Sequence, residues 1–223
     1  MNNGILLVNK ARGTLSFKLV TLLRKKTGIE KIGHAGTLDP FATGLMVMLL
    51  GRDYTKKSDT FLTCDKEYKA TIHLGVETDT YDIDGKVMAR SDLIPTVSEL
   101  HTVLQSFQGT ILQTPPMFSA KKMQGKKLYE LARQGKTVER QPVSVQVSIV
   151  CTRYEYPEVD IQVVCSKGTY IRSLAHDIGQ KLGTGGHLSS LTRLRSGTFS
   201  VDHAVPEEKL LDPSFDLQPH IKP

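Results

Sequence analysis

Gly33-His34-Ala35-Gly36-Thr37-Leu38-Asp39-Pro40-Phe41-Ala42-Thr43-Gly44 is the stretch on which the interpretation of this chain depends. It surrounds one carboxylate, Asp39, with three glycines and one proline. Glycine permits backbone conformations and close approaches that a side chain would block. Pro40 fixes its own φ and pushes Asp39 toward an extended conformation. The apolar run from Leu45 to Leu50 follows at once and would anchor the segment in a core. The stretch therefore predicts a stiff turn that presents one carboxylate to a substrate.

The same pattern is also typical of an ordinary structural turn. Glycine-rich loops are common, and an aspartate that precedes a proline often only starts a turn. Shape alone therefore leaves two interpretations of Asp39 open, a catalytic carboxylate and a turn residue.

Length and composition indicate a globular protein with one sizeable core. The chain has 223 residues, of which 39% are hydrophobic and 23% are charged, as is ordinary for such proteins. No apolar run is long enough to cross a bilayer, and the N-terminus lacks a signal-peptide pattern. The three cysteines, Cys64, Cys151 and Cys165, lack CxxC spacing. We therefore expect a cytoplasmic protein without a disulfide framework, a zinc knuckle or a membrane contact.

The net charge of +6 favours a polyanionic partner. Much of it lies in one stretch whose basic residues are Lys121, Lys122, Lys126, Lys127, Arg133, Lys136 and Arg140. Only Glu130 and Glu139 oppose them there, and Arg193 with Arg195 forms a second basic cluster. A charge run is usually a solvated helix face, but this imbalance of sign favours a surface that contacts phosphates.

Hydrophobic periodicity predicts a mixture of strands and helices. We expect strands over 4–8, 68–76, 143–150 and 160–165, and helices over 16–27, 97–107 and 170–182. Ser16 is expected to cap the first helix, and Gly28 and Gly183 to end the first and last. Because the order shows no strict βαβ repeat, an α+β fold around a largely antiparallel mixed sheet is expected.

Several motifs that would require a metal or a cofactor fail in detail. The acidic segment that ends at Gly85 does not fit a calcium loop, because Ser91 would occupy the position that requires glutamate. The P-loop order is absent, and the histidines lack metal-ligand spacing. No second acid lies in a loop like that of Asp39, as a hydrolase with paired carboxylates would need. We expect neither metal nor cofactor, and interpret residues 79–85 as a turn between strands.

Arg172 lies in the first turn of a predicted helix, where a cation opposes the helix dipole. A buried carboxylate partner would explain this position, since arginine suits bidentate pairing with aspartate. The alternative places Tyr170 in the core and Arg172 in water. Tyr68 is by default a strand aromatic.

Six segments together resemble the bacterial TruB family of tRNA pseudouridine synthases, in the family's order. They are GHAGTLDPFATG (33–44), KEYKA (66–70), TDTYDIDG (78–85), MFSAKKMQGKKLYELARQGKTVER (117–140), SKGTYIRSLAHDIGQKLG (166–183) and GGHLSSLTRL (185–194). The resemblance covers most of residues 4–200. The N-terminal KPxGxTS pattern departs from the family at Ala11 and Leu15, which puts the packing of that segment in doubt.

The resemblance implies a pseudouridine synthase fold and a catalytic domain over 1–205, with a basic thumb inserted at about 115–141. Residues 206–223 would be a short tail, without a C-terminal PUA-type RNA-binding domain. The site residues implied are Asp39, Tyr170 and Arg172 for catalysis; His34, Tyr68, Tyr170 and Leu191 for the substrate; and Lys121, Lys122, Lys126, Lys127 and Arg133 for RNA.

The implied reaction isomerises uridine 55 in the T loop of tRNA without a cofactor, after the base is flipped out of its stack. Asp39 would act as a nucleophile at C1′ or as a base at C2′, with Arg172 orienting it. Tyr68 would stack on the base, His34 would hold the emptied loop, and Leu191 would contact the uridine through its backbone. The expected partner is the T-arm of tRNA, and the protein is expected to be a monomer. A tRNA-folding chaperone with secondary catalysis is the alternative.

Overall fold

The structure of the protein, a computed structural model, describes residues 3–119, 121–123 and 125–223, and the side chains of residues 122, 123 and 127 lie outside this description. The chain forms two compact units. The first consists of Met1–Lys69 with Leu191–Pro223, and the second of Ala70–Ser190. Strands β4 (Lys66–Leu74) and β12 (Gly186–Ser196) contribute residues to both.

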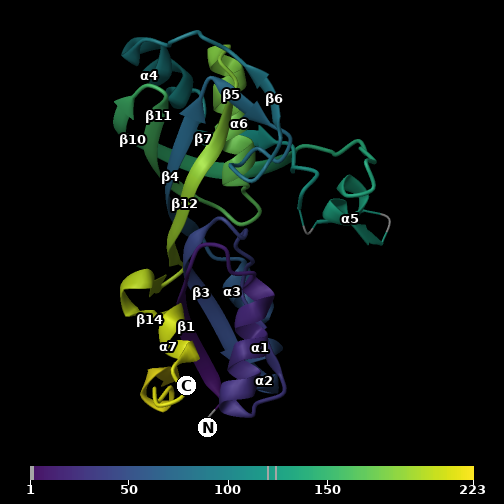
Figure 1. Ribbon diagram of the computed structural model, residues 1–223, viewed down its shortest axis with the longest axis vertical. Coiled ribbons are helices and arrows are strands. Elements are labelled where there is room, and N and C mark those ends of the chain that lie inside the picture. Colours follow the sequence, from purple (N-terminus) through teal and green to yellow (C-terminus); the bar gives the residue numbers. More distant parts are fainter. Residues whose placement is uncertain (1–2, 120, 124) are drawn as a thin grey trace. The chain divides into compact units, whose positions relative to one another are not determined.

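The first unit is built around β3, which is buried from its second residue onward. β3 pairs antiparallel with β1 and β2 and parallel with β12, and Figure 1 shows α1 alongside these strands. Its elements are β1 (Gly4–Lys10), α1 (Ser16–Thr27), β2 (Ile32–His34), β3 (Thr43–Leu50), α2 (Arg52–Thr55), α3 (Ser58–Leu62), β13 (Phe199–Ser200), η1 (Val201–His203), β14 (Val205–Pro206), α7 (Glu207–Leu211), η2 (Gln218–His220) and β15 (Ile221–Lys222).

Helix α1 starts one residue earlier than a Ser16 cap would require. Leu15 is the N-cap and makes no side-chain cap bond, and Ser16 is the first helical residue. The predicted cap is wrong because the hydroxyl of Ser16 bonds the backbone of Leu38 instead. Gly28 ends the helix in the left-handed conformation, as predicted.

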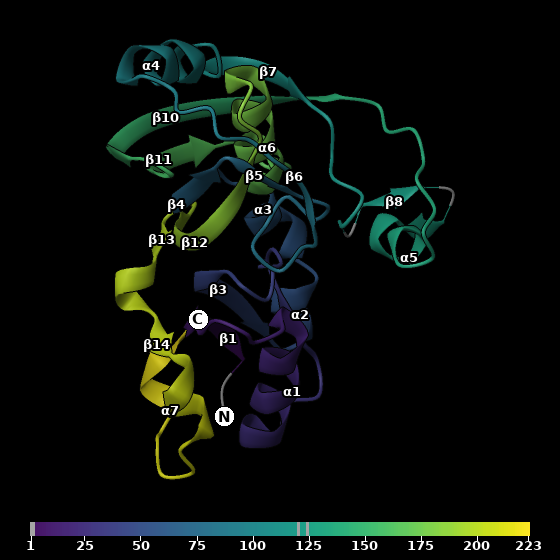
Figure 2. The ribbon, with the colours of Figure 1, turned by 45° about the horizontal axis from the view of Figure 1, so that its top comes forward.

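The second unit contains a sheet with the strand order β12-β4-β11-β10-β7. β10 pairs antiparallel with both β11 and β7. Figure 2 shows α6 beside these strands. Figures 1 and 2 show α5 in a small lobe apart from the sheet, formed by the segment that connects β7 to β10. The further elements are β5 (Val76–Thr78), β6 (Val87–Arg90), α4 (Val97–Gln105), β7 (Gly109–Gln113), β8 (Lys122–Met123), β9 (Lys126–Lys127), α5 (Leu128–Ala132), β10 (Val143–Glu155), β11 (Glu158–Cys165) and α6 (Ile171–Leu182).

The strands and helices that periodicity predicted are present as β1, β4, β10, β11, α1, α4 and α6. Along β4, the side chains of Tyr68, Ala70, Ile72 and Leu74 are buried and the intervening ones are not, as strand alternation requires. Gly183 ends α6 in the left-handed conformation. The expected α+β class, with a largely antiparallel mixed sheet and flanking helices, is confirmed.

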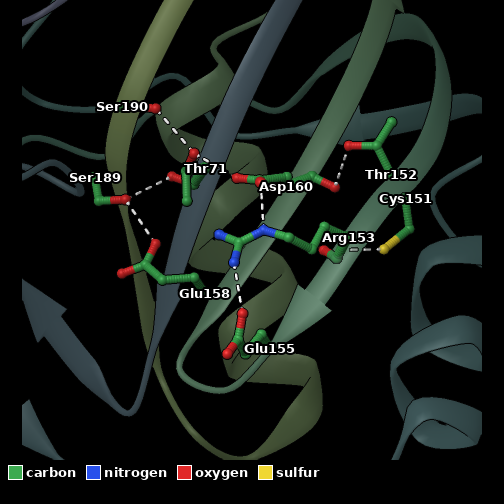
Figure 3. A network of polar contacts seen from close by, with 9 residues as sticks. All are labelled: Thr71, Cys151, Thr152, Arg153, Glu155, Glu158, Asp160, Ser189 and Ser190. Atoms are coloured by element: carbon green, nitrogen blue, oxygen red, sulfur yellow. Dashed lines mark hydrogen bonds and ion pairs between the residues drawn. The ribbon is translucent and has the colours of Figure 1, made fainter.

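Polar side chains connect the strands of the second unit on the face opposite this core (Figure 3). Thr71 on β4 donates to Asp160 on β11 at 2.7 Å, and Arg153 on β10 donates to the same carboxylate at 2.8 Å. Ser190 on β12 lies 2.9 Å from the Thr71 hydroxyl. These bonds support the strand register, because a slip by one residue would move every one of these side chains to the other face.

Gly44, the last residue of the Asp39 stretch, tests how tightly β3 packs on β12. Gly44 has a φ of +99°, and an added Cβ would lie 2.3 Å from the carbonyl oxygen of Arg193. We expect Gly44→Ala to lower the free energy of unfolding by more than about 2 kcal/mol. Gly13 has a φ of +83° but open space around it, so Gly13→Ala should cost only about 1 kcal/mol of backbone strain. Chemical denaturation measures both, and equal losses would contradict the packing described.

Candidate active site

Asp39 lies in the loop between β2 and β3, half-buried, and the backbone on both sides of it is bonded to the segment around the start of α1. The Ser16 hydroxyl donates to the carbonyl of Leu38 at 2.8 Å and accepts from its N–H at 3.0 Å. The N–H of Gly13 donates to the carbonyl of Pro40 at 2.7 Å. These bonds hold the residues before and after Asp39, so the loop is the firmly held turn that the sequence predicted.

Lys10, the last residue of β1, is fully buried and also supports this loop. Its Nζ donates to three backbone carbonyls, among them Thr14 at 2.8 Å and Pro40 at 3.2 Å. The bond to Pro40 ties the end of β1 to the residue that follows Asp39. A buried ammonium group needs such partners, because burial of an unpaired charge is strongly unfavourable.

Glu207, the first residue of α7, supplies a negative charge near Lys10. Its buried carboxylate accepts from the Ala11 N–H and from the Thr14 hydroxyl, both at 2.7 Å. Burial lowers the pKa of Lys10 to about 8, although the charges of Glu207 and then Asp39 favour the protonated form. No local pattern in the sequence indicates this contact, because 196 residues separate Glu207 from Ala11.

Arg193 on β12 bonds carbonyls on both sides of Asp39. Its side chain is 1% exposed, and it donates to the carbonyls of Leu45 at 2.7 Å and Gly36 at 3.1 Å. The expectation that Arg193 and Arg195 add to a phosphate-contacting surface is wrong for Arg193, which is in the core. The planar guanidinium of Arg193, with five N–H donors, suits a site surrounded by carbonyls. The neighbouring basic residue Arg195 pairs with the carboxylate of Glu67 at 2.9 Å.

Three further predicted site residues belong to the first unit. His34 ends β2, and burial, followed by the positive charge of Arg193, lowers its pKa. Tyr68 on β4 is buried with 9% of its surface exposed. Leu191 on β12 is buried, and its carbonyl accepts from the Thr43 hydroxyl at 3.4 Å. The substrate roles of these residues stay predictions.

Arg172, in the first turn of α6, is buried in the second unit and contacts two other segments. It donates to the carbonyls of Thr80 at 3.0 Å and Phe118 at 2.7 Å, and it lies 3.4 Å from the Asp82 carboxylate. The expectation of a buried carboxylate partner is confirmed by Asp82, which is 5% exposed. The alternative that Arg172 lies in water is wrong. Its pairing with Asp39 stays a prediction.

Asp82 was missed as a site residue because its segment was interpreted only as a turn between strands. The segment is such a turn, between β5 and β6. Asp82 accepts from the Thr80 hydroxyl at 2.6 Å and from the Asp84 N–H at 3.2 Å. Only burial distinguishes Asp82 from its acidic neighbours Asp79 and Asp84, which are exposed, and the pattern of charges in the sequence does not show it.

Tyr170 is the residue that precedes α6, half-buried rather than enclosed in the core. Gln113, at the end of β7 and fully buried, bonds its backbone on both sides. The Tyr170 N–H donates to Gln113 Oε1 at 2.7 Å, and Gln113 Nε2 donates to the Tyr170 carbonyl at 3.0 Å. This fixes the backbone at the N-terminus of α6, directly before Arg172.

The basic thumb presents its described lysines to solvent. Lys121, Lys126 and Arg133 are exposed, and Arg133 stacks over the ring of Tyr129 at 5.6 Å. The side chains of Lys122 and Lys127 lie outside the described residues. Arg140 is only half-exposed and donates to the carbonyl of Pro115 at 3.1 Å. The exposed cations suit contact with phosphates, and their RNA-binding role stays a prediction.

The described residues contain neither a candidate metal cluster nor a membrane-spanning helix. No group of three or more His, Cys, Asp and Glu side chains among them is arranged to hold a metal ion. No helix in the described part of the chain is long and apolar enough to cross a membrane.

Solved structures identify the class of protein to which this fold belongs. A chain in the crystal structure of a Cbf5-Nop10-Gar1 complex matches with a TM-score of 0.73 and 30% identity, over 94% of this chain and 54% of that chain. A chain in the structure of an H/ACA RNP bound to a substrate RNA containing 2′-deoxyuridine matches with a TM-score of 0.68 and 28% identity, over 94% and 52%. The fold is that of a pseudouridine synthase.

Sequence comparison then gives the family. Residues 24–171 match the N-terminal domain of the TruB family pseudouridylate synthases, and residues 172–223 match the tRNA pseudouridylate synthase B C-terminal domain. The chain belongs to the TruB family, as its motifs predicted.

Similar curated proteins carry one name. The tRNA pseudouridine synthase B of Chlamydia abortus is 54% identical over 222 residues, which cover 100% of this chain and 94% of that protein. The protein of the same name from Protochlamydia amoebophila is 59% identical over 202 residues, covering 91% and 77%.

The lowered pKa of Lys10 predicts how stability depends on pH. The group's ordinary pKa is 10.5, and its value in the folded protein is about 8. Between these values the unfolded chain binds the proton that the folded chain releases, so the free energy of unfolding rises with pH. From pH 7 to about pH 9.5, the wild type should gain about 2 kcal/mol relative to Lys10→Met.

Urea denaturation at both pH values measures this difference. Lys25, an exposed lysine of α1, supplies the control, and Lys25→Met should follow the pH profile of the wild type. Parallel profiles for the wild type and Lys10→Met would contradict the assignment of the shift to Lys10.

Proposed function

We propose that this chain isomerises uridine to pseudouridine at position 55 in the T loop of tRNA. One observation carries the proposal: the chain is 54% identical, over its whole length, to a protein named tRNA pseudouridine synthase B. The held loop that carries Asp39 supports it, because one firmly placed carboxylate is what an isomerisation without a cofactor requires of the protein.

The chemistry breaks the bond between N1 and C1′ of uridine, turns the base and joins C5 to C1′. The proton lost from C5 is balanced by the proton gained at N1, so the product is an isomer of the substrate. The Asp39 carboxylate acts at the ribose, either as the nucleophile at C1′ or as the base at C2′. Both roles need the ionised form of the carboxylate.

The remaining residues bind and orient the nucleotide. Tyr68 stacks on the flipped base, a contact worth about 1–3 kcal/mol in proteins that bind unpaired bases. Tyr170, placed by Gln113 at the start of α6, hydrogen-bonds the base or assists removal of the C5 proton. Arg172 orients the catalytic carboxylate. The exposed cations of the thumb contact the phosphates of the T-arm.

Asp39→Asn tests the catalytic assignment. The amide keeps the shape of the side chain but cannot act as a nucleophile or a base, so we expect loss of pseudouridine formation of about 10⁴-fold or more with unchanged tRNA binding. The measurement is pseudouridine mapping on an unmodified tRNA, with binding measured by filter retention. Pseudouridine at the T loop made by Asp39→Asn would overturn the assignment. Little functional loss in a variant that makes no pseudouridine would favour the folding chaperone.

The thumb is tested through the salt dependence of tRNA binding. Each lysine or arginine that neutralises a phosphate adds about 0.7–0.9 to the slope of log Kd against log salt concentration. The triple variant Lys121→Ala, Lys126→Ala and Arg133→Ala should therefore lose about 2 units of slope. A matched variant that removes three exposed lysines elsewhere, Lys25, Lys31 and Lys86, should keep the slope of the wild type. Equal slopes for both variants would contradict a phosphate-contacting thumb.

A further inference from the structure

Helix α6 contacts the turn between β5 and β6 at two points that lie one helical turn apart. Arg172 and His176 are four residues apart and therefore share a face of α6. Arg172 bonds the Thr80 carbonyl and pairs with Asp82. The imidazole of His176 stacks on the ring of Tyr81, with 3.9 Å between ring centroids and 14° between planes. The residues of the turn that Arg172 and His176 contact are thus consecutive, Thr80, Tyr81 and Asp82.

The stack of Tyr81 on His176 contains two locally unfavourable features. Tyr81 has a φ of +64°, and it is the only residue other than glycine with a positive φ among those that the structure describes. That conformation is a genuine outlier for a bulky side chain. The Nδ1 atom of His176 is buried without a hydrogen-bond partner in the described part of the chain, since Glu77 Oε1 is 3.6 Å away. Such features persist where the surrounding structure imposes them, and they concentrate at functional sites.

The backbone of the turn is fixed on its other side by β12. The Leu188 N–H donates to the carbonyl of Tyr81, and the Ile83 N–H donates to the carbonyl of Leu188, both at 3.0 Å. These two bonds flank Asp82. The unusual φ of Tyr81 therefore lets the turn keep its bonds to β12 while the ring meets α6.

Filling of the core is not sufficient to explain the strained tyrosine. Tyr81 is half-exposed, and it lines an open cavity of about 310 Å³ together with Phe118 and Arg140 of the thumb segment. Phe118 is also the residue whose carbonyl Arg172 bonds. The strain is therefore located next to the Arg172 site rather than in a packed interior.

We propose that the stack of Tyr81 on His176 positions the turn whose Thr80 carbonyl and Asp82 carboxylate orient the guanidinium of Arg172. Tyr81 and His176 are positioning residues, because they act through Arg172. Burial lowers the pKa of His176, although Glu77 opposes the shift, so the ring is neutral near pH 7 and acts by stacking. This inference rests on the proposed function, since the reaction that Arg172 serves is pseudouridine formation.

The first test compares variants that remove the stack with variants that keep it. Tyr81→Gly and His176→Ala remove a ring, and we expect each to lower the single-turnover rate of pseudouridine formation by about ten-fold or more. tRNA affinity should stay within about two-fold, because the exposed cations of the thumb that are proposed to contact phosphates are unchanged. Tyr81→Phe and His176→Phe keep two stacked rings and should recover most of the rate. The exposed His101 of α4 supplies the control His101→Ala, which should match the wild type.

Thermal unfolding separates positioning from mere stabilisation. Glycine adopts the φ of residue 81 without strain and alanine does not, so Tyr81→Gly should unfold at a higher temperature than Tyr81→Ala. A positioning role predicts that the single-turnover rate of pseudouridine formation is nevertheless low in both variants. A reaction rate for Tyr81→Gly equal to that of the wild type would overturn the proposal. Reaction rates that rise and fall across the variants in step with their unfolding temperatures would also overturn it, because they would indicate mere stabilisation.

Amide hydrogen exchange tests the inference independently of activity. In His176→Ala, the amides of Ile83 and Leu188 should exchange about ten-fold faster or more, since the turn is no longer held from α6. In His176→Phe they should exchange at the rate of the wild type. Unchanged exchange in His176→Ala would overturn the positioning role of the stack. A wild type that makes no pseudouridine would overturn the proposed function alone.

Discussion

Two buried positive charges, those of Lys10 and Arg193, hold the loop that presents Asp39. Between them they donate to the carbonyls of Gly36, Pro40 and Leu45, before and after the carboxylate. A buried cation is stable only if it is hydrogen-bonded or paired, so these carbonyls have to meet the two side chains. Lys10 thereby ties the last residue of β1 to Pro40. Arg193 ties β12 to Gly36 and to Leu45 of β3. These bonds set the conformation of the loop.

The second unit also contains a buried cation that is bonded to backbone carbonyls. Arg172 is buried and donates to the carbonyls of Thr80 and Phe118, and Asp82 compensates its charge. One planar group binds acceptors from two segments. The Arg172 guanidinium therefore holds both the turn after β5 and the start of the thumb in place. Arginine suits this task better than lysine, since its donors are arranged in a fixed plane.

The sequence predicted what depends on periodicity and on local backbone chemistry. The alternation along β4, the ends of α1 and α6 at Gly28 and Gly183, and the turn at residues 79–85 were all predicted from neighbouring residues. The buried charges were not, because Arg193 bonds a carbonyl 148 positions away and Glu207 an amide 196 positions away. Arg193 was assigned to the surface for that reason, and Gln113 and Asp82 were missed. A lysine or arginine in a sequence carries no sign of its burial.

We infer that the position of the Asp39 carboxylate, and not only its charge, makes the site work. Asp39→Glu keeps the charge but moves the carboxylate by one methylene, on a loop whose backbone is bonded before and after this residue. We expect its single-turnover rate of pseudouridine formation on saturating tRNA to fall by about 100-fold, with tRNA affinity unchanged. A rate equal to that of the wild type would show that the charge of residue 39 is sufficient and that the exact position of its carboxylate is not required.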